Sequence, residues 1–214
     1  MLRTTTASLS ILGVFGASVA ILTASPAAAR VKAADVTVLA KDRILSPAVQ
    51  PLYVTSPAAV AGQPIPDVYT AFGKNTSPPI SWDGAPPNTL AYVVIMEDSD
   101  AGSPTPKLHW VAYNIPGAAK GLSHAIRNAA EPKVFSGMRQ GVNDFGGMGY
   151  IGPHPDVGDP PHHYHFEVFA LDRPLSIKGG LSLNKVIAAM NERVIAEGEV
   201  VGTFAAPPGP PPTR

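Results

Sequence analysis

Residues 90–97 (LAYVVIME) decide the fold class of this chain. The stretch is short, nearly all apolar and rich in β-branched and aromatic residues, and polar loops flank it. These features favour a buried β-strand over a helix, because a buried helix is normally longer. We therefore expect a β-sheet at the centre of the protein.

Further strands are expected on either side of this stretch. Residues 109–114 (HWVAYN) form one that Pro116 ends, and residues 163–171 (HYHFEVFAL) alternate with the period of two of a half-buried strand. In that strand one face carries Tyr164, Phe166, Val168 and Ala170, and the other carries His163, His165 and Glu167. Shorter strands are expected within residues 36–40, 48–73 and 200–204.

Residues 181–197 carry a helical pattern. Their apolar side chains recur at helical spacing, at Leu183, Val186, Ile187, Met190, Val194 and Ile195. Ser182 suits the N-cap and Gly198 the C-terminal stop. The chain is therefore predicted to be mainly β, with a helix near its C-terminus.

The composition excludes several classes of protein. The chain has 214 residues, 45% of them hydrophobic, which suits one domain with a sizeable core. Its 16 Lys and Arg balance its 16 Asp and Glu, so it lacks the basic excess of a nucleic-acid-binding protein, and no nucleic-acid partner is expected. Because the chain has no cysteine, disulfides, thiolate nucleophiles and cysteine-ligated metal sites are excluded.

Both ends of the chain differ in composition from its middle. Arg3, the apolar run 7–22 and the small residues Ala27-Ala28-Ala29 have the layout of a secretory signal peptide cleaved near Ala29. A retained membrane anchor is the alternative, although the run is shorter than the ~20 apolar residues that a span needs. Residues 205–214 (AAPPGPPPTR) predict a Pro-rich disordered tail. We expect a signal peptide over residues 1–29, one domain over residues 30–204, a tail over residues 205–214, and a mature protein that is periplasmic or secreted.

Polar side chains gather where the expected strands begin or end. Asp98 and Asp100 follow residues 90–97, His109 begins the next strand, and a Gly- and Pro-rich loop over residues 143–155 leads to residues 162–165 (HHYH). Loops at the ends of rigid strands are where sites are usually built. Each feature also has a purely structural interpretation: turn-capping aspartates, a core histidine, a tight loop and a solvent-facing strand.

Together these motifs resemble the phosphatidylethanolamine-binding protein family, in its bacterial Raf-kinase-inhibitor-like branch. Residues 75–82 (NTSPPISW) are similar to the family's SPPLxW segment, and residues 98–101 (DSDA) to its DPDAP signature. Further motifs follow in the family's order up to about Phe204: His109-Trp110, Asn114-Ile115-Pro116, the loop NDFG…GYxGP and the strand H-x-Y-x-F.

The resemblance implies a Greek-key β-fold of packed antiparallel sheets with helical segments near the C-terminus. It also implies a small surface pocket for phosphate-type anions, lined by Asp98, Asp100, His109, Gly152, Pro153, His162 and Tyr164. His162 and Tyr164 lie two residues apart, so a strand would turn both toward the pocket and turn His163 and His165 away. No cofactor is implied. Bacterial relatives imply that a homodimer can form, and the kinase-inhibitor label implies a protein partner.

The sequence departs from the family pattern in three places. Ser99 and Gly102 replace the two prolines of DPDAP, which loosens the pocket rim. His154 stands where bacterial members often have a cysteine, and it adds an ionisable group near the rim. The Pro-rich tail takes the place of the C-terminal helical segment of animal members.

The expected function is binding of phosphate esters or phospholipid head groups. Aspartates beside the histidines would favour imidazolium, whose second nitrogen would donate to the ligand, and backbone N–H groups of the Gly152 loop would add donors. Phosphodiester binding would then be strongest in mild acid.

Three alternatives to this function stay open. They are a phosphoester or ester hydrolase with a His/Asp general base, a metal site of Asp98, Asp100, His109 and His162, and a protein-interaction module of the kinase- or protease-inhibitor kind that needs no ligand. The sequence has neither a G-x-S-x-G nucleophile elbow nor an HExxH metal motif. We therefore expect a binding protein that is not an enzyme.

Overall fold

The computed structural model describes residues 38–46, 49–102 and 105–209, which belong to one compact unit. The predicted signal peptide lies outside the described residues. Within the described part of the chain, no helix is both long and apolar enough to cross a membrane.

The larger of two sheets has six strands. In spatial order they are β1 (Gln50–Pro51), β9 (Val194–Phe204), β8 (His162–Leu171), β4 (Ala91–Asp98), β5 (Lys107–Pro116) and β7 (Arg139–Gln140). Neighbours run antiparallel except for the parallel pair of β1 and β9. The smaller sheet has the order β2 (Tyr53–Thr55), β3 (Ile80–Asp83) and β6 (Gly121–Leu122). The helical segments are α1 (Ala40–Arg43), the 3-10 helix η1 (Asp67–Tyr69) and α2 (Leu183–Met190).

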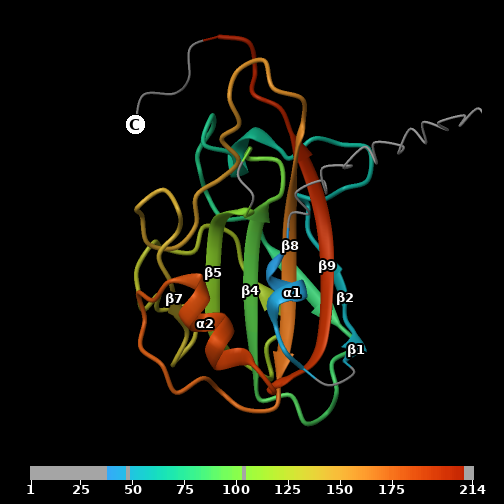
Figure 1. The fold of residues 1–214 in the computed structure, drawn as a ribbon, viewed down its shortest axis with the longest axis vertical. Coiled ribbons are helices and arrows are strands. Elements are labelled where there is room, and N and C mark those ends of the chain that lie inside the picture. The colour runs from blue at the N-terminus through green and yellow to red at the C-terminus, as the bar shows by residue number, and fades with distance from the viewer. Residues whose placement is uncertain (1–37, 47–48, 103–104, 210–214) are drawn as a thin grey trace, which may run out of the picture. The chain divides into compact units, whose positions relative to one another are not determined.

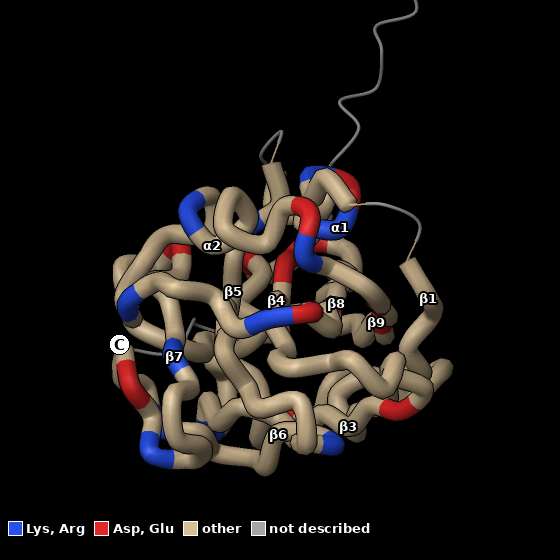
Figure 2. The backbone as a smooth tube through the Cα atoms, turned by 90° about the horizontal axis from the view of Figure 1, so that it is seen from below, with Lys and Arg blue, Asp and Glu red and all other residues tan. Residues whose placement is uncertain are grey.

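The larger sheet lies between the smaller sheet and the two α-helices, as Figures 1 and 2 show. One face packs into a core with the smaller sheet, which includes Val94, Met96, Phe166, Ile80 and Trp82. The other face packs into a core with the helices, which includes Val93, Ile95, Phe169, Val186 and Met190. Burial on both faces explains why the sequence of β4 is a continuous apolar run.

Antiparallel pairing brings three strand ends together at one end of the larger sheet. Asp98, the last residue of β4, pairs with Lys107 at the start of β5 and with Tyr164 near the start of β8. A β-bulge lies beside this end, because Met96 pairs with Trp110 whereas Glu97 pairs with Leu108, which leaves an extra residue, His109, in β5. Bulges redirect side chains and often lie next to binding sites.

The mainly β fold with antiparallel sheets is confirmed, and the strands expected at residues 90–97, 109–114 and 163–171 are present as β4, β5 and β8. The interpretation of residues 163–171 as half-buried was wrong beyond His165. There both faces of β8 are buried, Glu167 included, because helices cover the second face of the sheet.

Two other predictions were wrong. In the described part of residues 36–40, Val38 and Leu39 have no regular structure and Ala40 begins α1, so no strand forms there. The helix expected over residues 181–197 ends at Met190, and Gly198 lies inside β9. Glu192 adopts the left-handed conformation that ends the helix, and Val194 pairs with Leu171 of β8. Strand pairing therefore overrides the apolar spacing that continued past the helix.

Candidate functional site

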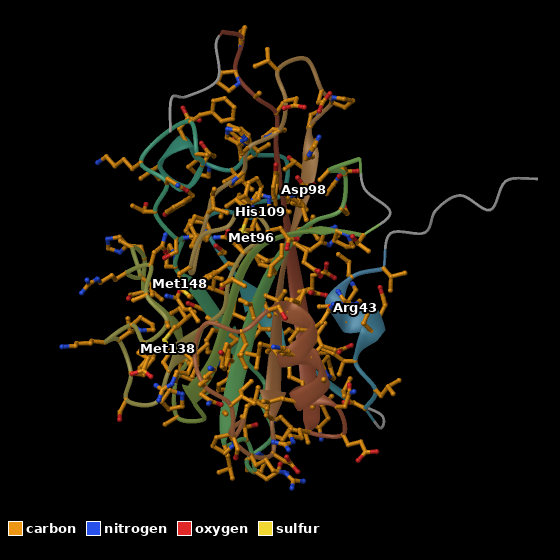
Figure 3. All side chains as sticks on the ribbon, turned by 60° about the vertical axis from the view of Figure 1, so that its left-hand side comes forward. Arg43, Met96, Asp98, His109, Met138 and Met148 are labelled. Carbon is orange, nitrogen blue, oxygen red and sulfur yellow. The ribbon has the colours of Figure 1, made fainter. Side chains whose placement is uncertain are left out.

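A pocket of about 650 Å³ lies where the three strand ends meet. Figure 3 shows two of its residues, Asp98 and His109, at the same end of the sheet. Of the seven residues that the sequence predicted, Asp98, Asp100, His109 and His162 line the pocket. The other lining residues are Ala101, Gly102, Lys107, Phe145, His154, Pro155, Asp156, Asp159, Pro160 and Pro161.

Asp98 and His162 form a buried pair in the pocket wall. Oδ2 of Asp98 lies 2.8 Å from Nδ1 of His162. The other ring nitrogen, Nε2, lies 3.5 Å from Oδ2 of Asp159. Both nitrogens of His162 therefore face carboxylate oxygens, and Asp159 stands beside the nitrogen that was expected to donate to a ligand.

His109 is held in the pocket wall as a neutral imidazole. Its Nδ1 lies 2.9 Å from the carbonyl oxygen of Ile151, and since a carbonyl only accepts, Nδ1 carries the proton. The ring also packs edge-on against Phe145 and Tyr164. Complete burial lowers the pKa of His109 to about 4. The expectation that His109 serves as an imidazolium donor near neutral pH was therefore wrong, because desolvation outweighs the nearby charge of Asp98.

Asp100 is tied to the outer side of the pocket rim. Its Oδ2 accepts the backbone N–H of His163 at 2.7 Å and lies 2.8 Å from Nδ1 of the same residue. Although partial burial acts in the opposite direction, these hydrogen bonds lower the pKa of Asp100. The backbone N–H of Asp100 donates to Oδ1 of Asp98 at 2.8 Å, which is the turn-capping arrangement that a structural interpretation of the two aspartates expects. His163 is exposed, as expected, but it positions Asp100.

Gly152 and Pro153 lie outside the pocket lining. The N–H of Gly152, expected to be free for a ligand, donates instead to Oδ1 of Asn75 at 2.7 Å. A Cβ atom on Gly152 would lie 2.1 Å from the carbonyl oxygen of Tyr69, so glycine is needed here for close backbone packing. The carbonyl of Pro153 accepts the N–H of Ala71. Both residues join the loop to the segment that contains η1.

Tyr164 lies beneath the pocket rather than in its lining, and it is fully buried. Its ring stacks on that of His162, so the two side chains share a face as predicted. Its hydroxyl has no partner in good hydrogen-bond geometry among the described residues, although the Asp98 carboxylate is close enough to perturb it. Burial, and then the negative charge of Asp98, raise the pKa of Tyr164 well above its usual range.

The sequence prediction missed pocket residues that carry charge or an aromatic ring. Lys107 precedes His109 by two residues, and strand alternation could have placed both on one face. Its Nζ lies 5.2 Å from the centre of the Phe145 ring, a cation–π arrangement. Asp156 and Asp159 enter from the loop before β8, and the sequence carries no pattern that would bring them here. His154, expected near the rim, lines the pocket and stacks on Phe72.

The pocket carries mixed charge. Four lining aspartates (Asp98, Asp100, Asp156 and Asp159) accompany Lys107 and the histidines His109, His154 and His162. In the described part of the chain, no group of three or more His, Asp or Glu side chains is placed to hold a metal ion. The arrangement offers donors and acceptors to a polar ligand.

Comparisons with known proteins place the chain among relatives that share this architecture. The family model described as phosphatidylethanolamine-binding protein matches residues 55–205. A UPF0098 protein of Aquifex aeolicus is 40% identical over 144 residues, which cover 67% of this chain and 82% of the relative. The UPF0098 protein YbcL of Escherichia coli is 34% identical over 141 residues, covering 64% of this chain and 77% of YbcL.

The solved structures that resemble the chain include two bacterial proteins. A phosphatidylethanolamine-binding protein homologue from Chlamydia trachomatis, CT736, superposes with a TM-score of 0.64 and 31% identity, covering 74% of this chain and 99% of CT736. YbcL of Escherichia coli, described as a member of the mammalian PEBP family, superposes with a TM-score of 0.65 and 30% identity, covering 73% of this chain and 99% of YbcL.

Proposed function

Because the chain belongs to the phosphatidylethanolamine-binding protein family, we propose that it is a binding protein whose pocket takes the head group of a phosphate ester. The observation that carries this proposal is the mixture of a lysine, histidines and aspartates in one pocket of about 650 Å³. A zwitterionic phosphodiester matches such a mixture better than a bare anion, which the four aspartates would repel, or a bare cation.

Lys107 and His162 are the groups that would meet the phosphate. Lys107 carries an ammonium group whose N–H donors suit phosphate oxygens, and His162 is oriented by its contact with Asp98. Asp156 and Asp159, which are both exposed, would meet the cationic end of the ligand. We further propose that the protein acts outside the cytoplasm after signal-peptide cleavage, and that ligand binding modulates a protein partner.

The test is titration calorimetry with glycerophosphoethanolamine, a diester that has no second phosphate ionisation. The diester should bind more tightly than dimethyl phosphate or ethanolamine, which each carry one of its charges. Lys107→Gln and His162→Gln should each weaken binding by about fivefold or more, as loss of ~1 kcal/mol in a charge-assisted contact predicts.

Lys133→Gln, at an exposed lysine outside the pocket lining, is the matched control and should bind as the wild type does. Unchanged affinity in both pocket variants, with wild-type melting temperatures, would falsify the assignment of the phosphate subsite. Steady release of nitrophenol from bis(p-nitrophenyl) phosphate would favour the hydrolase alternative instead.

A further inference from the structure

A second cluster of titratable side chains lies on the face of β4 that points away from the pocket. Glu97 immediately precedes Asp98, so its side chain projects to the helix-covered face of the sheet. Glu167 of β8 lies on the same face, because it pairs with Ile95, two residues from Glu97. Both glutamates are almost completely buried, with 0% and 1% of their surface exposed. The binding function proposed above uses neither of them.

These two glutamates hold the backbone of α1. Oε2 of Glu97 accepts the N–H of Ala40 at 2.7 Å, and Oε1 of Glu167 accepts the N–H of Lys41 at 3.1 Å. Figure 1 shows α1 in front of the sheet, over its β8 side. One oxygen of each carboxyl group therefore holds α1 on the sheet by a hydrogen bond.

The other oxygen of each carboxyl group is buried and makes no hydrogen bond to the described residues. Oε1 of Glu97 and Oε2 of Glu167 have no hydrogen-bond partner among the described residues, although the two carboxyl groups are close enough to interact with each other. Two adjacent buried carboxylates cannot both ionise without strong repulsion, whereas one shared proton lets one group donate to the other. A buried pair of this kind favours retention of one proton.

Charged groups surround this pair on every element packed against it. From α1, Arg43 places Nη1 3.8 Å from Oε1 of Glu97, and Lys41 pairs with Glu199 of β9. Glu199 also pairs with His165 of β8. Asp144 lies close enough to Glu97 to act on it, Glu197 lines a small cavity together with Glu167 and Lys41, and Asp42 acts on Lys41.

We propose that Glu97 and Glu167 hold α1 on the sheet only while they share a proton, and that loss of this proton releases the helix from the sheet. Without the proton, two negative charges face each other in a buried site, and separation of α1 would admit the water that they need.

The direction of the pH effect follows from the pKa shifts. Burial raises the pKa of Glu97 to about 7, and burial together with the charge of Glu97 raises the pKa of Glu167 well above its usual range. Both pKa values exceed those of glutamates in an unfolded chain. Docking of α1 on the sheet is therefore favoured in acid and weakens as pH rises through about 7. Glu199 does not titrate in that range, because its contacts with His165 and Lys41 lower its pKa to about 2.

Hydrogen–deuterium exchange of the Ala40 and Lys41 amides, expressed as protection factors between pH 5.5 and 8.5, tests this proposal. In the wild type these factors should fall with pH, by up to about tenfold per unit for release of one proton. Glu97→Gln should remove the dependence, because a glutamine can accept from Ala40 and donate permanently to Glu167. Glu167→Gln makes the reverse replacement and serves if the first variant does not fold.

Glu131→Gln, at an exposed glutamate paired with Arg139, is the matched control and should keep the wild-type dependence. The pair of His165 and Glu199 is present in every variant, so it cannot account for a difference between them. A flat wild-type profile, or an unchanged slope in both pair variants, would overturn the proposal. So would a parallel loss of protection throughout β4 and β8, since the effect would then be unfolding of the whole domain.

Discussion

Asp159 places a carboxylate beside His162, where the proposed ligand would bind. Its carboxylate lies 3.5 Å from Nε2, and its side chain is 46% exposed, so it can turn away when a competing anion arrives. A phosphate group near His162 must nevertheless approach this negative charge. In the function proposed above, the ligand specificity of the pocket would therefore depend on a residue that the sequence motifs do not include.

Replacement of Asp159 by asparagine should tighten the binding of dimethyl phosphate. An exposed charge contact is worth about 0.5–1 kcal/mol, so affinity should rise roughly two- to fivefold. Calorimetric titration of wild type and Asp159→Asn checks this, with Asp83→Asn, an exposed aspartate in β3, as the control. Weaker anion binding in Asp159→Asn would show instead that the carboxylate supports the site.

Single residues also show why the site was predicted only in part. Asp98, Asp100, His109 and His162 lie at strand ends, where local pattern and family resemblance agree. The role of Gly152 depends on the carbonyl of Tyr69, far away in the sequence, and no local signal reveals such a contact. The neutral state of His109 depends on burial in the folded chain, which composition does not report.

At the scale of elements, β4 separates two different environments. Its apolar run predicted a buried strand, and both faces are indeed covered. The run did not reveal that Glu97 and Asp98, adjacent at its end, serve opposite faces of the sheet. One faces α1 and the other faces the pocket.

The boundary between α2 and β9 shows where periodicity fails. Apolar residues continue at helical spacing past Met190, but the same residues also suit a strand beside β8. Local pattern cannot choose between these two structures, because pairing with a distant strand decides the outcome. The helix was therefore predicted correctly, but its predicted C-terminal end lies beyond the observed end at Met190.

Met190 tests the packing of α2 on the sheet. It is fully buried in the core that α2 shares with β4, β5 and β8, so Met190→Ala should lower the free energy of unfolding by about 2–5 kcal/mol. Urea denaturation measures this change. Lys185→Ala, on the exposed side of the same helix, should change it by less than about 0.5 kcal/mol. If Met190→Ala lowered the free energy of unfolding as little as Lys185→Ala does, α2 would contribute little stability through its buried side chains.

At the scale of the whole molecule, the fold was more predictable than the site. The fold prediction rested on several strand patterns and several family motifs along the chain, and these agreed with one another. The pocket depends on a few side chains from separate loops, and Lys107, Asp156 and Asp159 were missed. Cleavage of the N-terminal segment and disorder of the Pro-rich tail are separate properties, and both stay predictions.

The export proposal can be tested on the whole molecule. Expressed in a bacterial host from its full gene, the protein should lose the segment up to about Ala29, since Ala27-Ala28-Ala29 has the small side chains of a cleavage site. Mass spectrometry of the N-terminal peptide measures the cleavage, and cell fractionation measures the export. An intact Met1 in the soluble cytoplasmic fraction would contradict the proposal.

The outer strands of the larger sheet, β1 and β7, are each two residues long. An unpaired strand edge can recruit a strand of another molecule and start aggregation. Such short edges present few free N–H and C=O groups, and Pro51 in β1 has no N–H to donate. Edge strands this short offer little template for a strand of another molecule at the positions they cover.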